Sequence, residues 1–221
     1  MGTELNQPPE EVSEIVWLRS VLAAAGVAGA NNLAMFSAGS FVSTFDERAA
    51  APILLRCLPS LSEPWLVGSV VRHLRHERAN RTAFEALLRA YRQWTPRHSE
   101  LGSEIGRTLI VVAVPSDREH VAAILDLVSD PSAHGARRWL VDGLWRRRKD
   151  ERVLPVMVTL CSDDEVCDLA MPALRRAIGN DDALPVLARL RDTSASDHVR
   201  VHAARQARLA SNNLRRGTPR A

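Results

Sequence analysis

The stretch LPVMVTL at residues 154–160 recurs thirty residues later as LPVLARL at residues 184–190. Acidic residues precede each copy and a polar turn follows each, which are the start and stop signals of a helix. A second apolar series follows both turns, with an offset of thirty-three residues between the two copies: Val166, Ala170 and Leu174, then Val199, Ala203 and Ala207. The repeated unit is therefore a pair of helices.

The same template extends towards the N-terminus. The apolar spacing predicts three earlier helix pairs, at 117–129 with 135–147, at 80–94 with 101–113 and at 49–58 with 64–76, and a less regular pair within 10–45. Pro52 falls near a predicted helix start, where proline is tolerated. Pro155 and Pro185 fall inside predicted helices, which we expect them to kink, because proline removes one backbone hydrogen bond.

Composition agrees with an all-helical chain. Hydrophobic residues make up 46% of the 221 residues and aromatic residues only 5%, so the apolar share consists mainly of Ala, Leu and Val. These small helix formers favour close packing between helices. A single helix pair cannot bury its apolar stripe alone, whereas stacked pairs bury it against each other.

One segment carries a family resemblance. Asp197, Val199, Arg200, Ala203 and Ala204 form the pattern D-x-V-R-x-x-A-A, which resembles the second helix of a HEAT repeat. The resemblance implies an all-α, right-handed solenoid of about five to six antiparallel helix pairs over residues 10–211. Residues 1–9 and the basic segment 212–221 are predicted to be disordered ends. HEAT and armadillo-like folds host scaffolds, chaperones, nucleic-acid binders and a few enzymes, so the resemblance leaves function open.

Charge is distributed unevenly between the two helices of each pair. In the five predicted pairs with clear spacing, the first helices contain 9 basic and 11 acidic residues, whereas the second helices contain 15 basic and 6 acidic residues. In HEAT-type stacks the second helices line the concave surface, so the resemblance implies an arginine-rich groove that attracts acidic partners. The alternative is that bases at helix ends only complement the helix dipole. The candidate groove residues are Arg72, Arg75, Arg107, Arg137, Arg138, Arg146, Arg175, Arg176, Arg200, Arg205 and Arg208.

A more specific candidate site, of three residues, lies on the helix that is predicted to begin at Gly135. Trp139, Asp142 and Arg146 share one face there, apart from the apolar stripe. The residue types resemble those that alkylpurine DNA glycosylases built from HEAT-like repeats use in a basic groove. The spacing reproduces no motif of that family, and an ordinary packed Trp beside a surface Asp–Arg pair is the alternative interpretation.

Other chemistry has little support in the sequence. No phosphate-binding, dinucleotide-binding, nucleophile-elbow or zinc-protease motif occurs, and no cofactor or metal is predicted. His76-Glu77 is a single His-Glu dipeptide, whereas HEAT-repeat metal hydroxylases need several. Cys57, Cys161 and Cys167 have no metal-ligand spacing, which favours reduced thiols that pack as small apolar residues in the cytoplasm. The apolar run at 20–30 lacks the basic flank of a secretory signal and is too short to span a membrane.

Two functional hypotheses follow, in different classes. The first is a non-enzymatic protein–protein interaction scaffold whose groove holds a partner with an acidic segment, without a membrane or a small-molecule cofactor. The second is a nucleic-acid-binding protein, with base-excision chemistry as its catalytic version. A repeat domain that tunes a larger complex without using the groove fits the sequence equally well.

Overall fold

The computed structural model describes residues 13–32, 46–75 and 80–217. Throughout these residues the chain is helical or in turns and loops, and it contains no strand, so the all-α prediction is confirmed. The chain divides into two compact units, Met1–Ala113 and Val114–Ala221, which we describe separately. Within the same residues, no helix is both long enough and apolar enough to cross a membrane.

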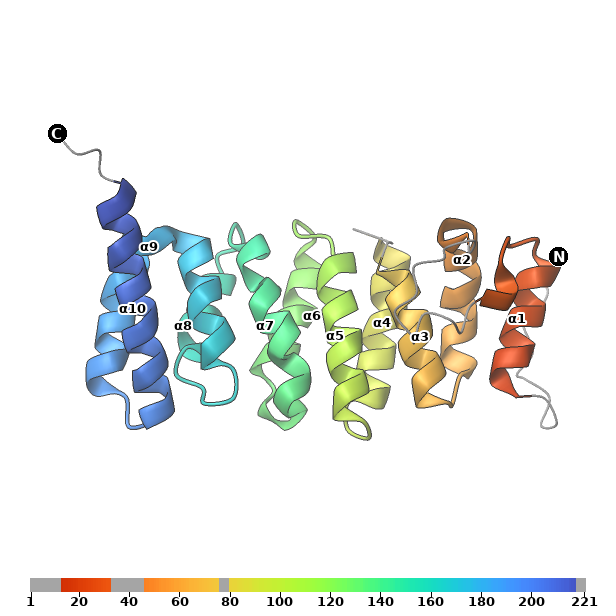
Figure 1. Cartoon of the computed structure of the whole chain (residues 1–221), viewed down its shortest axis with the longest axis horizontal. Coiled ribbons are helices and arrows are strands. Elements are labelled where there is room, and N and C mark those ends of the chain that lie inside the picture. Colours follow the sequence, from red (N-terminus) through yellow and green to blue (C-terminus); the bar gives the residue numbers. More distant parts are fainter. Residues whose placement is uncertain (1–12, 33–45, 76–79, 218–221) are drawn as a thin grey trace. The chain divides into compact units, whose positions relative to one another are not determined.

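In the part of the first unit that the structure describes (13–32, 46–75 and 80–113) there are five α-helices and two short 3-10 turns. In chain order they are α1 (Glu14–Ala24), η1 (Ala30–Asn32), α2 (Glu47–Cys57), η3 (Leu58–Ser60), α3 (Pro64–Leu74), α4 (Arg81–Trp94) and α5 (Ser99–Val112). Asp46 and Asn80 start α2 and α4 by accepting hydrogen bonds from backbone amides of the first turn. Helix α2 packs on α3, α4 on α5, and α3 on α5, so the second helices lie side by side in front of α4 (Figure 1).

The second unit continues the alternation of first and second helices. Its elements are α6 (Arg118–Ser129), η4 (Pro131–Arg137), α7 (Arg138–Gly143), η5 (Leu144–Arg147), α8 (Val153–Leu160), α9 (Cys167–Thr193) and α10 (Asp197–Gly217). Helix α6 packs on α7 and α8, while α9 packs on α7, α8 and α10. Apolar residues of the repeated stripe, including Val166, Leu174, Val199 and Ala203, are fully buried between these helices.

Helix α9 contains both the second helix of one predicted pair and the first helix of the next. Its backbone breaks at Gly179, where φ is 88° and ψ is 172°. Such angles are accessible to glycine because it has no Cβ. The two predicted segments, 166–178 and 181–192, therefore exist on either side of this break.

The proline predictions need correction. Pro155 is the third residue of α8, in the first turn, where its missing amide would have had no partner within the helix. The break expected near Pro185 lies at Gly179 instead. Pro52 is the sixth residue of α2, so it lies inside that helix and not at its start.

Two boundaries also differ from prediction. The helix expected from 135 to 147 is divided into η4, α7 and η5, and His134 before it has a positive φ of 42°. Helix α10 continues to Gly217, so residues 212–217 of the predicted disordered tail are helical. The predicted disordered segment 1–9 and the end of the tail, 218–221, lie outside the described residues.

All three cysteines are buried and unpaired, as predicted for thiols that pack as small apolar residues. Burial raises the pKa of Cys57 and Cys167 to about 11 and that of Cys161 to about 12. The thiolate is the reactive form, so all three groups are held in the unreactive state at neutral pH.

We therefore expect the folded protein to react with an aromatic disulfide reagent at pH 8 at least about 100-fold more slowly than free cysteine. Absorbance of the released thiolate measures the rate. The same protein in denaturant is the control, and there all three thiols should react. Rapid reaction of one thiol in the folded state would contradict the burial of that group.

Candidate functional site

The second-helix faces are the surfaces on which the predicted site residues fall. We use this name for the exposed sides of α3 and α5 in the first unit, and of α7, the first half of α9 and α10 in the second. Ten of the thirteen predicted residues belong to the second unit: Arg137, Arg138, Trp139, Asp142, Arg146, Arg175, Arg176, Arg200, Arg205 and Arg208.

Two ion pairs join α7 to α9. Arg138 donates to Asp168 at 2.6 Å and also to the backbone carbonyl of Glu165 at 2.6 Å. Arg176 of α9 donates to Asp142 of α7 at 2.8 Å. In one pair the cation belongs to α7, and in the other it belongs to α9, so each helix contributes one cation and one anion. The two pairs together fix the position of α7 along α9.

Arg137 is a structural residue. Its side chain is 3% exposed, and it donates to Asp163 at 2.7 Å, to Glu165 at 3.0 Å and to the carbonyl of Val128 at 3.1 Å. Both carboxylates belong to the turn between α8 and α9. Arg137 thus holds that turn and is not presented to a partner.

Arg175 and Arg200 are engaged within the chain as well. Arg175 donates to Asn180 at 2.9 and 3.1 Å and to Gln206 of α10 at 2.7 Å. Arg200 contacts Asp197 and donates to the carbonyl of Ser194 at 2.8 Å. Charge reversal at Arg175 would therefore break contacts inside the protein as well as any contact with a partner.

Three predicted arginines of this unit form no ion pair with the described residues. The guanidinium of Arg146 lies 5.1 Å from the ring centroid of Trp145, a cation–π contact. Arg205 is exposed on α10. Arg208 is exposed on α10 and lines a groove with Leu184, Ala188 and other residues of the second half of α9.

The first unit holds the other three predicted residues. Arg75 of α3 donates to Glu104 at 2.6 Å and to the Thr108 hydroxyl at 3.4 Å, both on α5. Arg107 is on the exposed side of α5. Arg72 is half-buried, and its Nε is buried without a hydrogen-bond acceptor.

The set resembling a glycosylase site is already engaged in intrachain contacts. Asp142 accepts from Arg176, and Arg146 covers Trp145. Trp139 is 40% exposed on the same helix.

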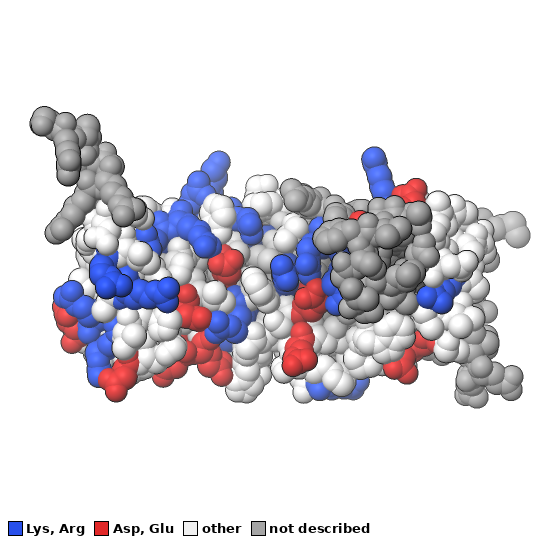
Figure 2. Space-filling model, in the orientation of Figure 1, with Lys and Arg blue, Asp and Glu red and all other residues white. Residues whose placement is uncertain are grey.

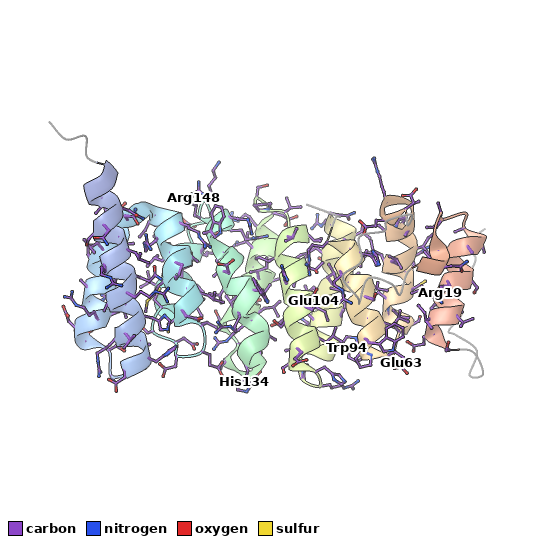
Figure 3. All side chains as sticks on the ribbon, viewed as in Figure 1. Arg19, Glu63, Trp94, Glu104, His134 and Arg148 are labelled. Carbon is purple, nitrogen blue, oxygen red and sulfur yellow. The ribbon has the colours of Figure 1, made fainter. Side chains whose placement is uncertain are left out.

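The second-helix face of the second unit is therefore mixed in charge. Figure 2 shows Lys and Arg side chains interspersed with Asp and Glu side chains over this unit. Figure 3 shows His134 and Arg148 at opposite ends of the α7 region, so the polar contacts extend along its whole length. The acidic partners were missed from sequence because they belong to the next repeat.

A signal for these partners does exist in the sequence. The contacts connect residues 26 to 34 positions apart, which is close to one repeat: Arg137–Asp163 at 26, Arg75–Glu104 at 29, Arg138–Asp168 at 30, Arg175–Gln206 at 31 and Asp142–Arg176 at 34. A search for complementary residues one repeat apart would have found them.

Comparison with known proteins leaves this geometry without a relative. No family model, no curated protein and no solved structure matches the chain.

Within the described residues no group of three or more His, Cys, Asp or Glu side chains could hold a metal ion. His198 and His202 form a ring contact at 4.5 Å, and His73 is buried beside Glu47.

We expect the two sides of the Arg137 cluster to respond differently to mutation. Arg137→Met leaves partly exposed carboxylates that water can solvate, so the free energy of unfolding should fall by about 1–3 kcal/mol. Asp163→Asn combined with Glu165→Gln leaves a buried guanidinium without a carboxylate and should cost about 3–5 kcal/mol. Urea denaturation measures both values. Equal or reversed costs would show that the arginine is solvated in the native state.

The pH dependence of stability has a predictable sign. The hydrogen bond from Arg152 lowers the pKa of Asp150 to about 2, and hydrogen bonds from His134 and then Arg137 lower the pKa of Glu165. A depressed carboxylate pKa stabilises the native state above the unfolded pKa and loses that effect as pH falls through the folded one.

We therefore expect the free energy of unfolding to fall from pH 4 towards pH 2. Thermal denaturation at a series of pH values measures this change. The Asp150→Asn variant should show a shallower decline than the unmodified chain, and the same decline in both would exclude a contribution from Asp150.

Proposed function

We propose that this chain is a non-enzymatic, HEAT-like interaction scaffold that binds an acidic segment of a partner protein on its second-helix faces. The observation that carries the proposal is the lateral pairing of second helices, α3 with α5 and α7 with α9, through polar side chains one repeat apart. Such pairing holds surface side chains in place before a partner arrives, which reduces the entropy cost of binding.

The exposed cations of the second unit support an acidic partner. Arg146 and Arg205 lie on the second-helix face without an ion pair to the described residues, and Trp139 adds an aromatic side chain there. Arginine and tryptophan are the residue types most often found at the energetic centre of protein interfaces. The engagement of Asp142 by Arg176 favours this role over a catalytic one.

A cytoplasmic location forms part of the proposal. Three buried thiols with raised pKa values and no disulfide are typical of a protein that functions in a reducing compartment. The proposal retains the solenoid that the HEAT resemblance implies over residues 10–211, in which the second helices line the concave side.

The charge-reversal pair Arg146→Glu and Arg205→Glu tests the proposal. The full-length tagged chain should recover a stoichiometric partner from its host, and this double variant should reduce the recovery at least about tenfold, because two attractive contacts become repulsive. Arg208→Glu is the matched control: it carries the same change on α10 but lies in a different groove. Partner recovery that is unaffected by the double variant would place the binding surface elsewhere.

Nuclease treatment in the same experiment separates the two classes of partner. A protein partner should persist after nuclease digestion. Recovery of nucleic acid in the untreated sample, together with an affinity that falls steeply as salt rises, would overturn the protein-partner proposal in favour of nucleic-acid binding.

A further inference from the structure

An open cleft of about 720 Å³ lies between the first halves of α3 and α5, within the first unit. Its lining includes Trp65, Gly68 and Arg72 from α3, and His98 and Glu104 from α5 and its start. Gly68 helps to create the space, because a Cβ at this position would lie 3.5 Å from Leu101 Cδ1 and 3.8 Å from Arg72 Nη1. The volume is in the usual range of ligand-binding clefts.

Arg72 is the least satisfied charge of this cleft. Its Nε is buried and has no hydrogen-bond acceptor, and its guanidinium forms no ion pair with the described residues. Arg75, one turn further along α3, is fully engaged by Glu104 and Thr108. A ligand carboxylate in the cleft can accept a charge-assisted hydrogen bond from this guanidinium, which is stronger than a bond between neutral groups.

An aromatic side chain stands beside this cation. Trp65 is 50% exposed although it is one of the largest apolar side chains of the chain, and it lines the same cleft at the first turn of α3. Exposed tryptophan next to an unsatisfied arginine is the combination that anchors peptide segments at protein interfaces.

The start of α5 adds to the attraction for an anion. Helix α5 begins at this cleft, and His98 does not cap it with a side-chain hydrogen bond, whereas α3 begins with Pro64 and the amides of Leu66 and Val67 bond to the Glu63 carbonyl. Figure 3 shows Glu63 and Trp94 near this end of the unit, with Glu104 further along. Free amides of a first helical turn favour negative charge.

The charged groups facing the cleft carry both signs. The lining contains the cations Arg72 and Arg97 and the anions Glu100 and Glu104. Glu104 is already bonded to Arg75, and Glu100 belongs to the first turn of α5. With Glu104 paired to Arg75, the lining retains Arg72 and Arg97 against Glu100, so positive charge is in excess there.

We propose that this cleft is a binding site for an acidic peptide segment. A carboxylate of the peptide bonds to the guanidinium of Arg72, and a neighbouring apolar side chain packs on the indole of Trp65. The inference rests on the proposed scaffold function and assigns one of its binding sites to the first unit.

Nuclear magnetic resonance of the full chain tests the site directly. The probe is a capped peptide with a central Phe flanked by Glu on both sides, and the matched probe has Gln in place of every Glu. We expect the acidic peptide to shift the Trp65 indole signal, which Trp65→Phe assigns, and the neutral peptide to leave it unchanged. Binding of both peptides with equal affinity would contradict the carboxylate contact.

Two variants and one control locate the contact. Arg72→Gln should weaken binding of the acidic peptide at least tenfold. Gly68→Leu should block it, because the added side chain extends from a Cβ position already in contact with Leu101 and Arg72, and its circular dichroism spectrum should match that of the unmodified chain. Arg208→Gln, on an exposed position of the second unit, should bind as the unmodified chain does. Unchanged affinity in both cleft variants would overturn the assignment.

The outcomes distinguish this site from the broader proposal. Peptide binding that shifts Trp139 or Trp145 but not Trp65 would remove the cleft assignment and retain an acidic-segment scaffold. Absence of binding at every indole would overturn both. A single-stranded thymidine oligonucleotide that shifts Trp65 where the acidic peptide does not would replace the peptide by nucleic acid as the occupant.

Discussion

Burial of small apolar side chains between neighbouring helix pairs is the interaction on which the rest of this structure depends. In each unit apolar side chains of the described helices are buried against neighbouring helices. Val166, Leu174, Val199 and Ala203 are buried in this way in the second unit, as Leu66, Val70 and Leu109 are in the first. At about 25 cal/mol per Å² of apolar surface removed from water, this burial is the main favourable term, and it accrues only when the pairs stack.

The same packing determines which polar residues meet. Once the stripes fix the offset between successive second helices, residues about thirty positions apart become neighbours on the surface. Arg75 then faces Glu104, Arg138 faces Asp168, and Asp142 faces Arg176. The excess of basic residues in the second helices remains after Glu104, Asp142 and Asp168 are counted there. Part of the basic charge is neutralised by these acids, and the charge of Arg137 is neutralised by Asp163 and Glu165 of the turn before α9.

The repeat pattern was sufficient to predict the helices and their alternation, because the apolar spacing and the helix-start signals are local properties of the sequence. Positions that depend on three-dimensional context were not predictable in the same way. Arg137 lies in a second-helix window like its neighbours, but it is buried because the turn containing Asp163 and Glu165 folds over it. The break at Gly179 was assigned to a proline because proline removes a hydrogen bond, whereas the observed backbone angles are ones that only glycine adopts readily.

Local neutralisation changes what kind of partner such a surface can recognise. A duplex or a long single strand gains affinity from many cations along a continuous track, and its binding weakens steeply with salt. Among the arginines without an ion pair to the described residues, Arg205 is exposed on α10, while Arg146 lies on Trp145 and Arg72 lines a cleft with Trp65. Such contacts give higher affinity for a ligand with a carboxylate next to an apolar side chain than for a ligand that only has a high density of negative charge. A short acidic peptide contains both groups side by side. Its binding can therefore be explained by these local contacts, without the electrostatic potential of the whole surface.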